Sequence, residues 1–356
     1  MPSLESLAPV LGSPESGDYT LLSAGVAVRQ NRIVHMYKVQ NLVQWMFGDW
    51  ATPYLNTSDI DAFRRVIHMS QLAQSGCLRA EAEHYRRGRD SPAATGGSLY
   101  WMLNDNWPAP SWTSLEYGGR QKLLHFEASR MFSTIAVSTY CTPSIEACTA
   151  MQLHVSSDSR ESIEGATLRV SAVRWADGVE GTSTTVLSSV TIPGLGGLTA
   201  SLDASGFASV LRGAACASAA DCFLIARLSN ASGSLMAPEV TQWVSLWKDA
   251  KLVAPANITV TAAPVVAADA VGGGGGGSES VAVTVTSDAV SPTVMVHCGS
   301  SSDFGTFDNN GLLLLPHVSQ TVVFTPRPGP PGTPPLDPCT TSADFYAVAV
   351  NGVSRT

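Results

Sequence analysis

From residue 133 onward the chain is built of short runs rich in β-branched residues, and turn-forming residues separate these runs. The first group precedes a break near Pro255 and reads "MQLHVS", "TLRVSAVRW", "TTVLSSVTI", "CFLIARLS" and "TQWVSLW". The second group reads "NITVTAA", "SVAVTVTS", "TVMVH", "TVVFTP" and "FYAVAVN", and its "DNNG" is a hairpin-type turn. Short strands at this spacing are typical of β-sandwiches. We therefore predict two immunoglobulin-like β-sandwich domains, residues 133–252 and 253–356.

Residues 1–132 have a different pattern, in which helical spacing dominates. We expect helices over residues 21–50, from Ser58 to about Arg87, and over residues 117–132, with Ser58 as the N-cap of the second. The run "SLYWMLN", residues 98–104, carries bulky side chains at both odd and even positions. This favours a strand that is buried on both faces, as in a parallel sheet covered by helices. The order helix, strand, loop, helix predicts a piece of an α/β fold.

The composition restricts the class of partner. Hydrophobic residues make up 44% of the 356 residues and charged residues 14%, which indicates a globular chain. The net charge of −8 argues against nucleic acid and against an anionic membrane surface, because both attract a basic face. No apolar stretch is long enough to span a membrane. A neutral ligand such as a glycan fits this balance better.

The cysteines and the sequons point to an oxidising compartment. Cys141 and Cys148 flank a short loop, as do Cys216 and Cys222, and such loops close readily as disulfides. Sequons for N-glycosylation occur at Asn56, Asn230 and Asn257. Together they predict a lysosomal or secreted protein. The start, "MPSLESLAPVLG", lacks the features of a signal peptide. The alternatives are therefore a cytoplasmic protein with reduced thiols, or a natural N-terminus outside this sequence, which the odd seventh cysteine favours.

The stretch from Gly96 to Gly119 concentrates aromatic, amide and carboxylate side chains, and it contains no basic residue. Trp101 lies near the end of the expected strand, where an indole can offer a flat apolar face to a pyranose. Asn104 and Asp105 could donate or accept hydrogen bonds with sugar hydroxyls. The competing interpretation is that the tryptophans pack in a core and that Asp105 caps a loop, and for Asp105 capping is favoured over catalysis.

The segment "GSLYWMLNDNWPAPSWTSLEYGGRQKLLHF" resembles the region around the eighth barrel strand of β-mannosidases of glycoside hydrolase family 2. That family reads tyrosine-tryptophan-glutamine-leucine-asparagine-aspartate, then a tryptophan-containing loop, proline-serine-tryptophan, and glutamate-tyrosine-glycine-glycine. "LRAEAEHYRRGR", "PSLESL" and "FDNNGLLLLP" resemble other family segments. The resemblance implies that residues 1–132 are the C-terminal end of a TIM (β/α)8 barrel, followed by the two sandwiches. It also implies hydrolysis of terminal non-reducing β-D-mannose residues with retention.

By this resemblance Trp101 is a sugar-stacking wall, with Asn104 and Trp107 as weaker substrate-binding candidates. The substrate would be a β-mannoside oligosaccharide or a mannoside derived from an N-glycan. Cys77 matches a family cysteine and would pair with a residue upstream. The chain departs from the family at Gln121 and Glu127, which replace a usual tryptophan and an apolar residue and suggest relaxed packing.

The catalytic carboxylates are the larger departure. A retaining glycosidase needs two carboxyl groups about 5 Å apart. In the family the acid/base glutamate follows an asparagine, and the nucleophile lies in a serine-glutamate-aromatic-glycine motif. The chain has no Asn-Glu dipeptide, and Ser278-Glu279 is followed by Ser280 rather than an aromatic residue. We therefore expect no catalytic residue in this chain, and no activity of the chain alone.

Other functions remain as alternatives. A non-catalytic glycan-binding β-sandwich module is the main one, although Trp175, Trp243 and Trp247 are spaced like core residues. A fragment without a separate function is compatible with the first interpretation. The seven histidines show no convincing ligand spacing, so we expect no metal, and nothing indicates another cofactor.

Overall fold

The computed structural model describes residues 1–12, 19–29, 33–55, 57, 59–92, 94–265 and 280–354. Asn56, Ser58 and the glycine run at 272–277 lie outside the described residues. The chain forms two compact units. The first comprises residues 1–75, 101–126 and 254–356, and the second comprises residues 76–100 and 127–253. This division differs from the three consecutive domains expected from the sequence, because it places the first and last parts of the chain in one unit.

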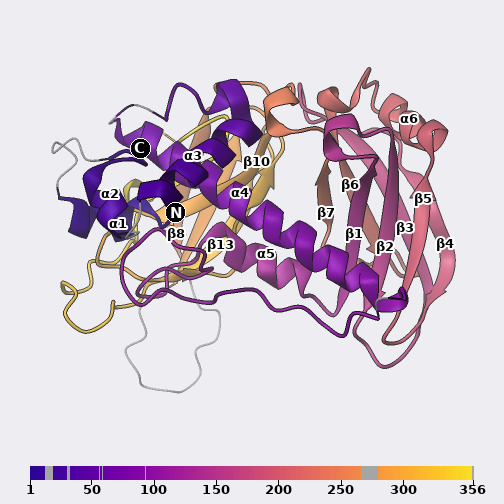
Figure 1. Ribbon diagram of the computed structural model, residues 1–356, viewed down its shortest axis with the longest axis horizontal. Coiled ribbons are helices and arrows are strands. Elements are labelled where there is room, and N and C mark those ends of the chain that lie inside the picture. Colours follow the sequence, from indigo (N-terminus) through magenta and orange to yellow (C-terminus); the bar gives the residue numbers. More distant parts are fainter. Residues whose placement is uncertain are drawn as a thin grey trace. The chain divides into compact units, whose positions relative to one another are not determined.

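The first unit contains the N-terminal helices and the last seven strands (Figure 1). Its helices are α1 (Leu4–Leu11), α2 (Ala24–Arg29), α3 (Ile33–Phe47) and the first part of α4 (Ile60–Arg87). Its strands are β8 (Ile258–Pro264), β9 (Val281–Ser287), β10 (Ser291–Cys298), β11 (Thr306–Phe307), β12 (Leu312–Leu314), β13 (Gln320–Thr325) and β14 (Phe345–Val348).

These strands form two antiparallel sheets, a four-stranded sheet in the order β11-β13-β9-β8 and a three-stranded sheet in the order β12-β10-β14. Val281, Val283 and Val285 are buried and alternate with more exposed residues, which confirms the expected period of two. Phe324 of one sheet meets Phe345 of the other edge-to-face at 5.3 Å between ring centroids. The two sheets therefore pack face to face as a sandwich.

The second unit contains β1 (Ile135–Thr142), β2 (Ala150–Ser157), β3 (Ile163–Arg174), β4 (Thr184–Ile192), β5 (Gly197–Leu202), β6 (Cys222–Ser229) and β7 (Val240–Trp243). A three-stranded sheet has the order β1-β2-β5 and a four-stranded sheet has the order β4-β3-β6-β7. Leu153 and Val155 of the first sheet share one buried core with Leu168 and Leu224 of the second. This unit is therefore also built on a sandwich of two antiparallel sheets.

A helix that the sequence analysis did not expect interrupts this sandwich. It is α6 (Ala204–Gly213), and Asp203 caps its N-terminus by accepting a hydrogen bond from the Gly206 N–H at 2.7 Å. Phe207, Val210 and Leu211 are buried in the sandwich core, at helical spacing. In "ASGFASVLRG" small residues separate the few apolar ones, and the flanking segments are β-rich. The helical spacing of the apolar residues is therefore too short a pattern to predict this helix from the sequence.

The expected helices are found, with corrected ends. α4 runs to Arg87 as expected. At its N-terminus the Asp59 carboxylate accepts a hydrogen bond from the Ala62 N–H at 2.8 Å, while the expected N-cap, Ser58, lies outside the described residues. The helix expected over 117–132 is α5 (Leu123–Met131) and begins six residues later. Gly118 and Gly119 precede it with φ of 90° and 103°, a backbone conformation that ends any helix there.

The strand expected over residues 98–104 is wrong. Within the described part of the chain no strand precedes Ile135, and the one pairing of this segment is an isolated parallel bridge from Asn104 to Leu115. Trp101 and Leu103 are exposed rather than buried on both faces. A strand needs a continuous ladder of hydrogen bonds to at least one neighbour, and this segment makes only the isolated bridge to the loop that follows it. The structure thus contains no parallel strand of a barrel among the described residues.

Six cysteines form three disulfides: Cys141–Cys148, Cys216–Cys222 and Cys298–Cys339. The spacing of the cysteines predicts the first two but not the third, because 41 residues separate its cysteines. Cys77 is exposed and free in this structure. None of the described helices has the length and apolar character required to cross a membrane.

Candidate functional site

The candidate site is the segment from Trp101 to Lys122, which lies in the first unit and folds back on itself. The Leu103 carbonyl accepts hydrogen bonds from the N–H groups of Ser114 and Leu115, at 3.1 and 2.7 Å. The Asp105 N–H donates to the Leu115 carbonyl at 3.1 Å, and the Lys122 N–H donates to the Ser114 carbonyl at 2.9 Å. These bonds hold the two arms of the loop together without a regular ladder.

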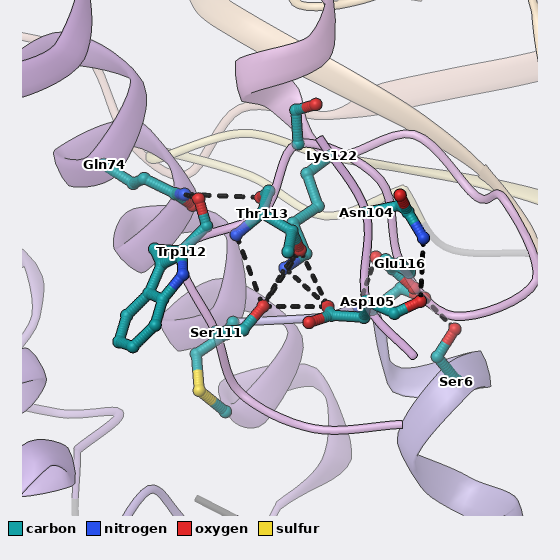
Figure 2. A network of polar contacts seen from close by, with 12 residues as sticks. Ser6, Gln74, Asn104, Asp105, Ser111, Trp112, Thr113, Glu116 and Lys122 are labelled. Atoms are coloured by element: carbon teal, nitrogen blue, oxygen red, sulfur yellow. Dashed lines mark hydrogen bonds and ion pairs between the residues drawn. The ribbon is translucent and has the colours of Figure 1, made fainter. Parts of the chain in front are cut away.

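A polar cluster formed by Asp105, Ser111, Thr113 and Lys122, in which all but the half-buried Ser111 are buried, holds the inside of this loop (Figure 2). The Asp105 carboxylate accepts hydrogen bonds from the hydroxyls of Ser111 and Thr113, at 2.8 and 2.7 Å. The Lys122 ammonium donates to Thr113 Oγ1 at 2.8 Å, to Ser111 Oγ at 3.2 Å and to the carboxylate at 3.4 Å. Asp105 therefore holds the loop, as the sequence analysis favoured.

Burial determines the electrostatics of this cluster. Lys122 is 0% exposed and Asp105 is 7% exposed. Desolvation lowers the pKa of Lys122, while the negative charges of Asp105 and Glu116 oppose that shift. A buried ammonium persists when a carboxylate and additional hydrogen-bond acceptors surround it. The Asp105–Lys122 pair is thus a fixed part of the loop rather than a pair of groups available to a substrate.

Glu116 and Arg120 attach the far end of the loop to the rest of the first unit. Glu116 accepts hydrogen bonds from the Ser3 N–H and hydroxyl, each at 2.7 Å, and from the Ser6 hydroxyl at 2.5 Å. Arg120 donates to the carbonyls of Ser300 and Asp303, each at 2.9 Å, and its guanidinium lies 4.2 Å from the centre of the Phe304 ring. The loop is therefore bound on one side to α1 and on the other to the 300–304 segment.

The tryptophan side chains of the loop are exposed, whereas its charged side chains are buried. Trp101 is 73% exposed and Trp112 is 52% exposed. Figure 2 shows the Trp112 indole pointing away from the polar cluster, while its carbonyl accepts a hydrogen bond from Gln74 at 2.7 Å. Exposed indole faces on a loop held by buried charges are suited to stacking against an apolar ligand face.

The three predicted substrate-binding residues have different surroundings. Trp101 is 73% exposed, against 39% for Trp107. Trp107 has one ring face covered, because the guanidinium of Arg29 lies 5.1 Å from its ring centre. Asn104 is exposed and its side-chain amide donates to the neighbouring Asp105 carbonyl at 3.2 Å. Asn104 and Trp101 retain surface for a ligand, whereas Trp107 offers less than the sequence suggested.

Sequence reasoning missed the residues that hold the loop, above all Lys122 and Glu116. The available signal was a lysine inside the apolar run "QKLLHF", where a solvated lysine is out of place.

The relaxed packing expected at Gln121 and Glu127 is wrong. The Gln121 amide pairs with the Phe307 backbone through two hydrogen bonds, at 2.8 and 3.2 Å. Glu127 binds Arg130 at 2.5 Å and Arg79 at 3.9 Å.

The loop cannot act as an acid or a base on a sugar. Asp105 and Glu116 are the two carboxylates of residues 101–122, and both are buried and hydrogen-bonded.

The described residues of the chain also offer no suitable metal site. Among the described residues, one group of metal-ligand type, Cys298, Asp303 and Cys339, is close together. Its sulfur atoms are bonded to each other, and Asp303 accepts hydrogen bonds from three backbone N–H groups, so the group does not suit an ion.

Residues 256–336 match the Ig-fold domain family of mannosidases. The chain is 30% identical to β-mannosidase of Capra hircus over 285 residues, which cover 76% of this chain and 29% of the relative. It is 42% identical to β-mannosidase A of Aspergillus flavus over 106 residues, which cover 29% of this chain and 11% of the relative. The chain thus spans less than a third of the length of these curated relatives.

The fold is similar to that of solved glycosidases. The β-D-mannosidase of Dictyoglomus thermophilum aligns with a TM-score of 0.66 at 14% identity, and the alignment covers all of this chain and 37% of that one. The exo-chitosanase of Amycolatopsis orientalis aligns with a TM-score of 0.55 at 18% identity, over 84% of this chain and 35% of that one. These two likenesses concern the fold alone. Together with the matches in sequence, they place the chain: it belongs to the β-mannosidase family of glycoside hydrolases.

Proposed function

We propose that this chain supplies the aromatic sugar-binding wall of a β-mannoside hydrolase, with Trp101 as the stacking surface. The observation that carries the proposal is the exposed Trp101 indole on a loop that buried charges hold in place. Asn104 adds an exposed amide three residues further along the same loop, and Trp107 is a secondary contact. An indole face binds the C–H face of a pyranose, and amides bind its hydroxyls.

The reaction we assign to the whole hydrolase is cleavage of terminal non-reducing β-D-mannose residues with retention. The name β-mannosidase of the relatives supports a β-mannoside as the substrate class. Within this class we propose a β-mannoside oligosaccharide or a mannoside derived from an N-glycan. Retention needs a nucleophilic carboxylate and an acid/base carboxyl group about 5 Å apart. Asp105 and Glu116 cannot serve, because both are buried and both accept the hydrogen bonds that hold the loop. We therefore propose that this chain by itself does not hydrolyse β-mannosides.

Two further assignments belong to the same proposal. Residues 1–132 correspond to the end of the barrel domain of a longer glycosidase, and residues 133–252 form a second immunoglobulin-like domain before the Ig-fold domain at 256–336. The protein resides in a lysosome or outside the cell. Three disulfides support this location, because cytosolic thiols are kept reduced.

The competing function is a non-catalytic glycan-binding module on one of the sandwiches. The structure disfavours a binding strip in the second unit, because its three tryptophans pack against one another. Trp175 lies 5.4 Å from Trp243, and Trp243 lies 4.7 Å from Trp247, between ring centroids. Trp175 and Trp247 are buried, so their faces are not available to a sugar.

Two measurements test the proposal. A chromogenic β-mannoside should show no turnover with the chain alone. Turnover that Trp101→Ala abolishes would overturn the proposal that the chain by itself is inactive. Saturation-transfer NMR with mannobiose should detect weak, millimolar binding that Trp101→Ala removes. Leu103→Ala is the matched control, since it also removes an exposed apolar side chain of the loop and should leave this binding unchanged. Tight binding that persists without Trp101 would favour the binding-module function instead.

A further inference from the structure

The loop between β6 and β7 in the second unit carries one of the sequons, Asn230-Ala-Ser. The side-chain oxygen of Asn230 accepts three hydrogen bonds, from the Ser232 N–H at 3.1 Å, the Ser232 hydroxyl at 2.7 Å and the Ser234 N–H at 2.9 Å. Its backbone closes the turn through bonds to Ser234 and to Gly233, whose φ of 86° suits glycine. The oxygen of this amide is therefore fully used by the loop.

The nitrogen of the same amide has no partner within the described part of the chain. Among the described residues Asn230 Nδ2 donates no hydrogen bond, and residues 231–235 are all exposed. A substituent on this nitrogen leaves the three bonds to the oxygen intact. Such a substituent also projects from an exposed turn, which the modifying enzyme can reach before and after folding. We propose that Asn230 is a site of N-linked glycosylation, and that it is occupied in preference to Asn257.

Asn257 has the opposite arrangement. Its side-chain nitrogen donates to Asp288 Oδ2 at 2.5 Å, and its backbone N–H donates to Asp288 Oδ1 at 2.8 Å. These two bonds lower the pKa of Asp288, because they stabilise its carboxylate. The sequon then enters β8, where Thr259 pairs with Thr286 of β9. Folding therefore engages the nitrogen of this sequon with Asp288 and fixes the backbone of its threonine in a sheet, whereas the nitrogen of Asn230 stays available.

The modification transfers an oligosaccharide from a lipid diphosphate carrier to the amide. A bond forms between Nδ2 and the anomeric carbon, and the bond between that carbon and the diphosphate oxygen breaks. The lipid diphosphate leaves with the electron pair, and one amide proton is released. The other amide proton remains, so the modified nitrogen is still a secondary amide. The step requires passage through the compartment in which the three disulfides would also form.

The test is site-by-site occupancy of the chain secreted from a eukaryotic host behind a cleavable leader. Deglycosylation by a peptide N-glycosidase in isotopically heavy water converts each occupied asparagine into a labelled aspartate, which peptide mass spectrometry counts. We expect Asn230 to be labelled in most molecules and Asn257 several-fold less. An unlabelled Asn230, or equal labelling of Asn257, would overturn the proposal.

Matched variants separate the sequon from the geometry. Ser232→Ala should abolish labelling of Asn230, whereas Ser234→Ala removes a neighbouring hydroxyl of the same turn and should leave it unchanged. Asp288→Ala frees the nitrogen of Asn257 and should raise labelling there; unchanged labelling would refute the protection by Asp288. Where a variant is not secreted, in-vitro translation in the presence of microsomes is used instead, and attachment of the oligosaccharide appears as slower migration of the chain on a gel. If the parent chain shows no such shift attributable to Asn230, the result counts against glycosylation at this site.

Discussion

Replacing Lys122 with methionine removes the ammonium of the buried cluster and keeps most of the side-chain volume. The Asp105 carboxylate would remain buried with two hydroxyl donors, from Ser111 and Thr113, and without its counter-charge. Removing one partner of a buried ion pair destabilises a protein by about 3–5 kcal/mol. Because the two hydroxyls continue to bind the carboxylate, we expect Lys122→Met to lower the free energy of unfolding of the first unit by about 3 kcal/mol.

The matched control is Lys251→Met, which removes an exposed ammonium 2.6 Å from Asp221. An exposed pair contributes about 0–1 kcal/mol, so this variant should lose no more than that. Adding Asp105→Asn to Lys122→Met should restore part of the loss, since a neutral amide is less costly to bury.

Urea unfolding gives the free energies, and hydrogen exchange localises the change. The amides of Leu115 and Lys122 donate to carbonyls of the loop and should exchange faster in Lys122→Met. Exchange is needed because a chain of two units need not unfold in one step. A loss for Lys122→Met no larger than that for Lys251→Met would refute the view that this ion pair holds the loop.

Two further predictions concern pH and the disulfides. Burial and the nearby charge of His297 lower the pKa of His68 to about 3, and neither ring nitrogen has a hydrogen-bond partner among the described residues. The unfolded chain therefore binds the proton first, so the stability due to neutral His68 is complete above about pH 6.5 and is lost as the pH falls toward 3. The buried carboxyl of Glu5, whose pKa is raised, acts in the opposite direction. Urea unfolding of His68→Leu between pH 7 and pH 4 should show a flatter profile than the parent chain, and an equal slope would contradict this. Replacing both cysteines of Cys298–Cys339 with serine should cost about 4 kcal/mol, against about 2 kcal/mol for Cys141–Cys148, because the longer loop gains more freedom when unfolded. Denaturant midpoints of the two double variants should follow that order, and the reverse order would show that strain or contacts decide instead.

Features that depend on neighbours in the sequence could be read without a structure. The helix from residue 60 to Arg87 follows from apolar spacing and from the breaking residues after it. The alternating valines of β9 follow from a period of two, and two short-loop disulfides follow from the spacing of their cysteines. Each of these signals lies within one turn, one strand or one short loop, so the local sequence is enough to specify it.

Features that depend on a distant partner could not be predicted from the sequence. Residues 98–104 have the composition of a buried strand, but a strand needs a neighbouring strand that continues the hydrogen-bond ladder, and the structure provides only an isolated bridge to Leu115. The Asp105–Lys122 pair joins residues 17 positions apart, and Cys298–Cys339 joins residues 41 apart. The sequence alone determined that the loop is aromatic and polar and that the remainder is β-rich. Only the tertiary structure decided that its charges are buried and its indoles exposed, because desolvation and hydrogen-bond pairing depend on which segments meet in space.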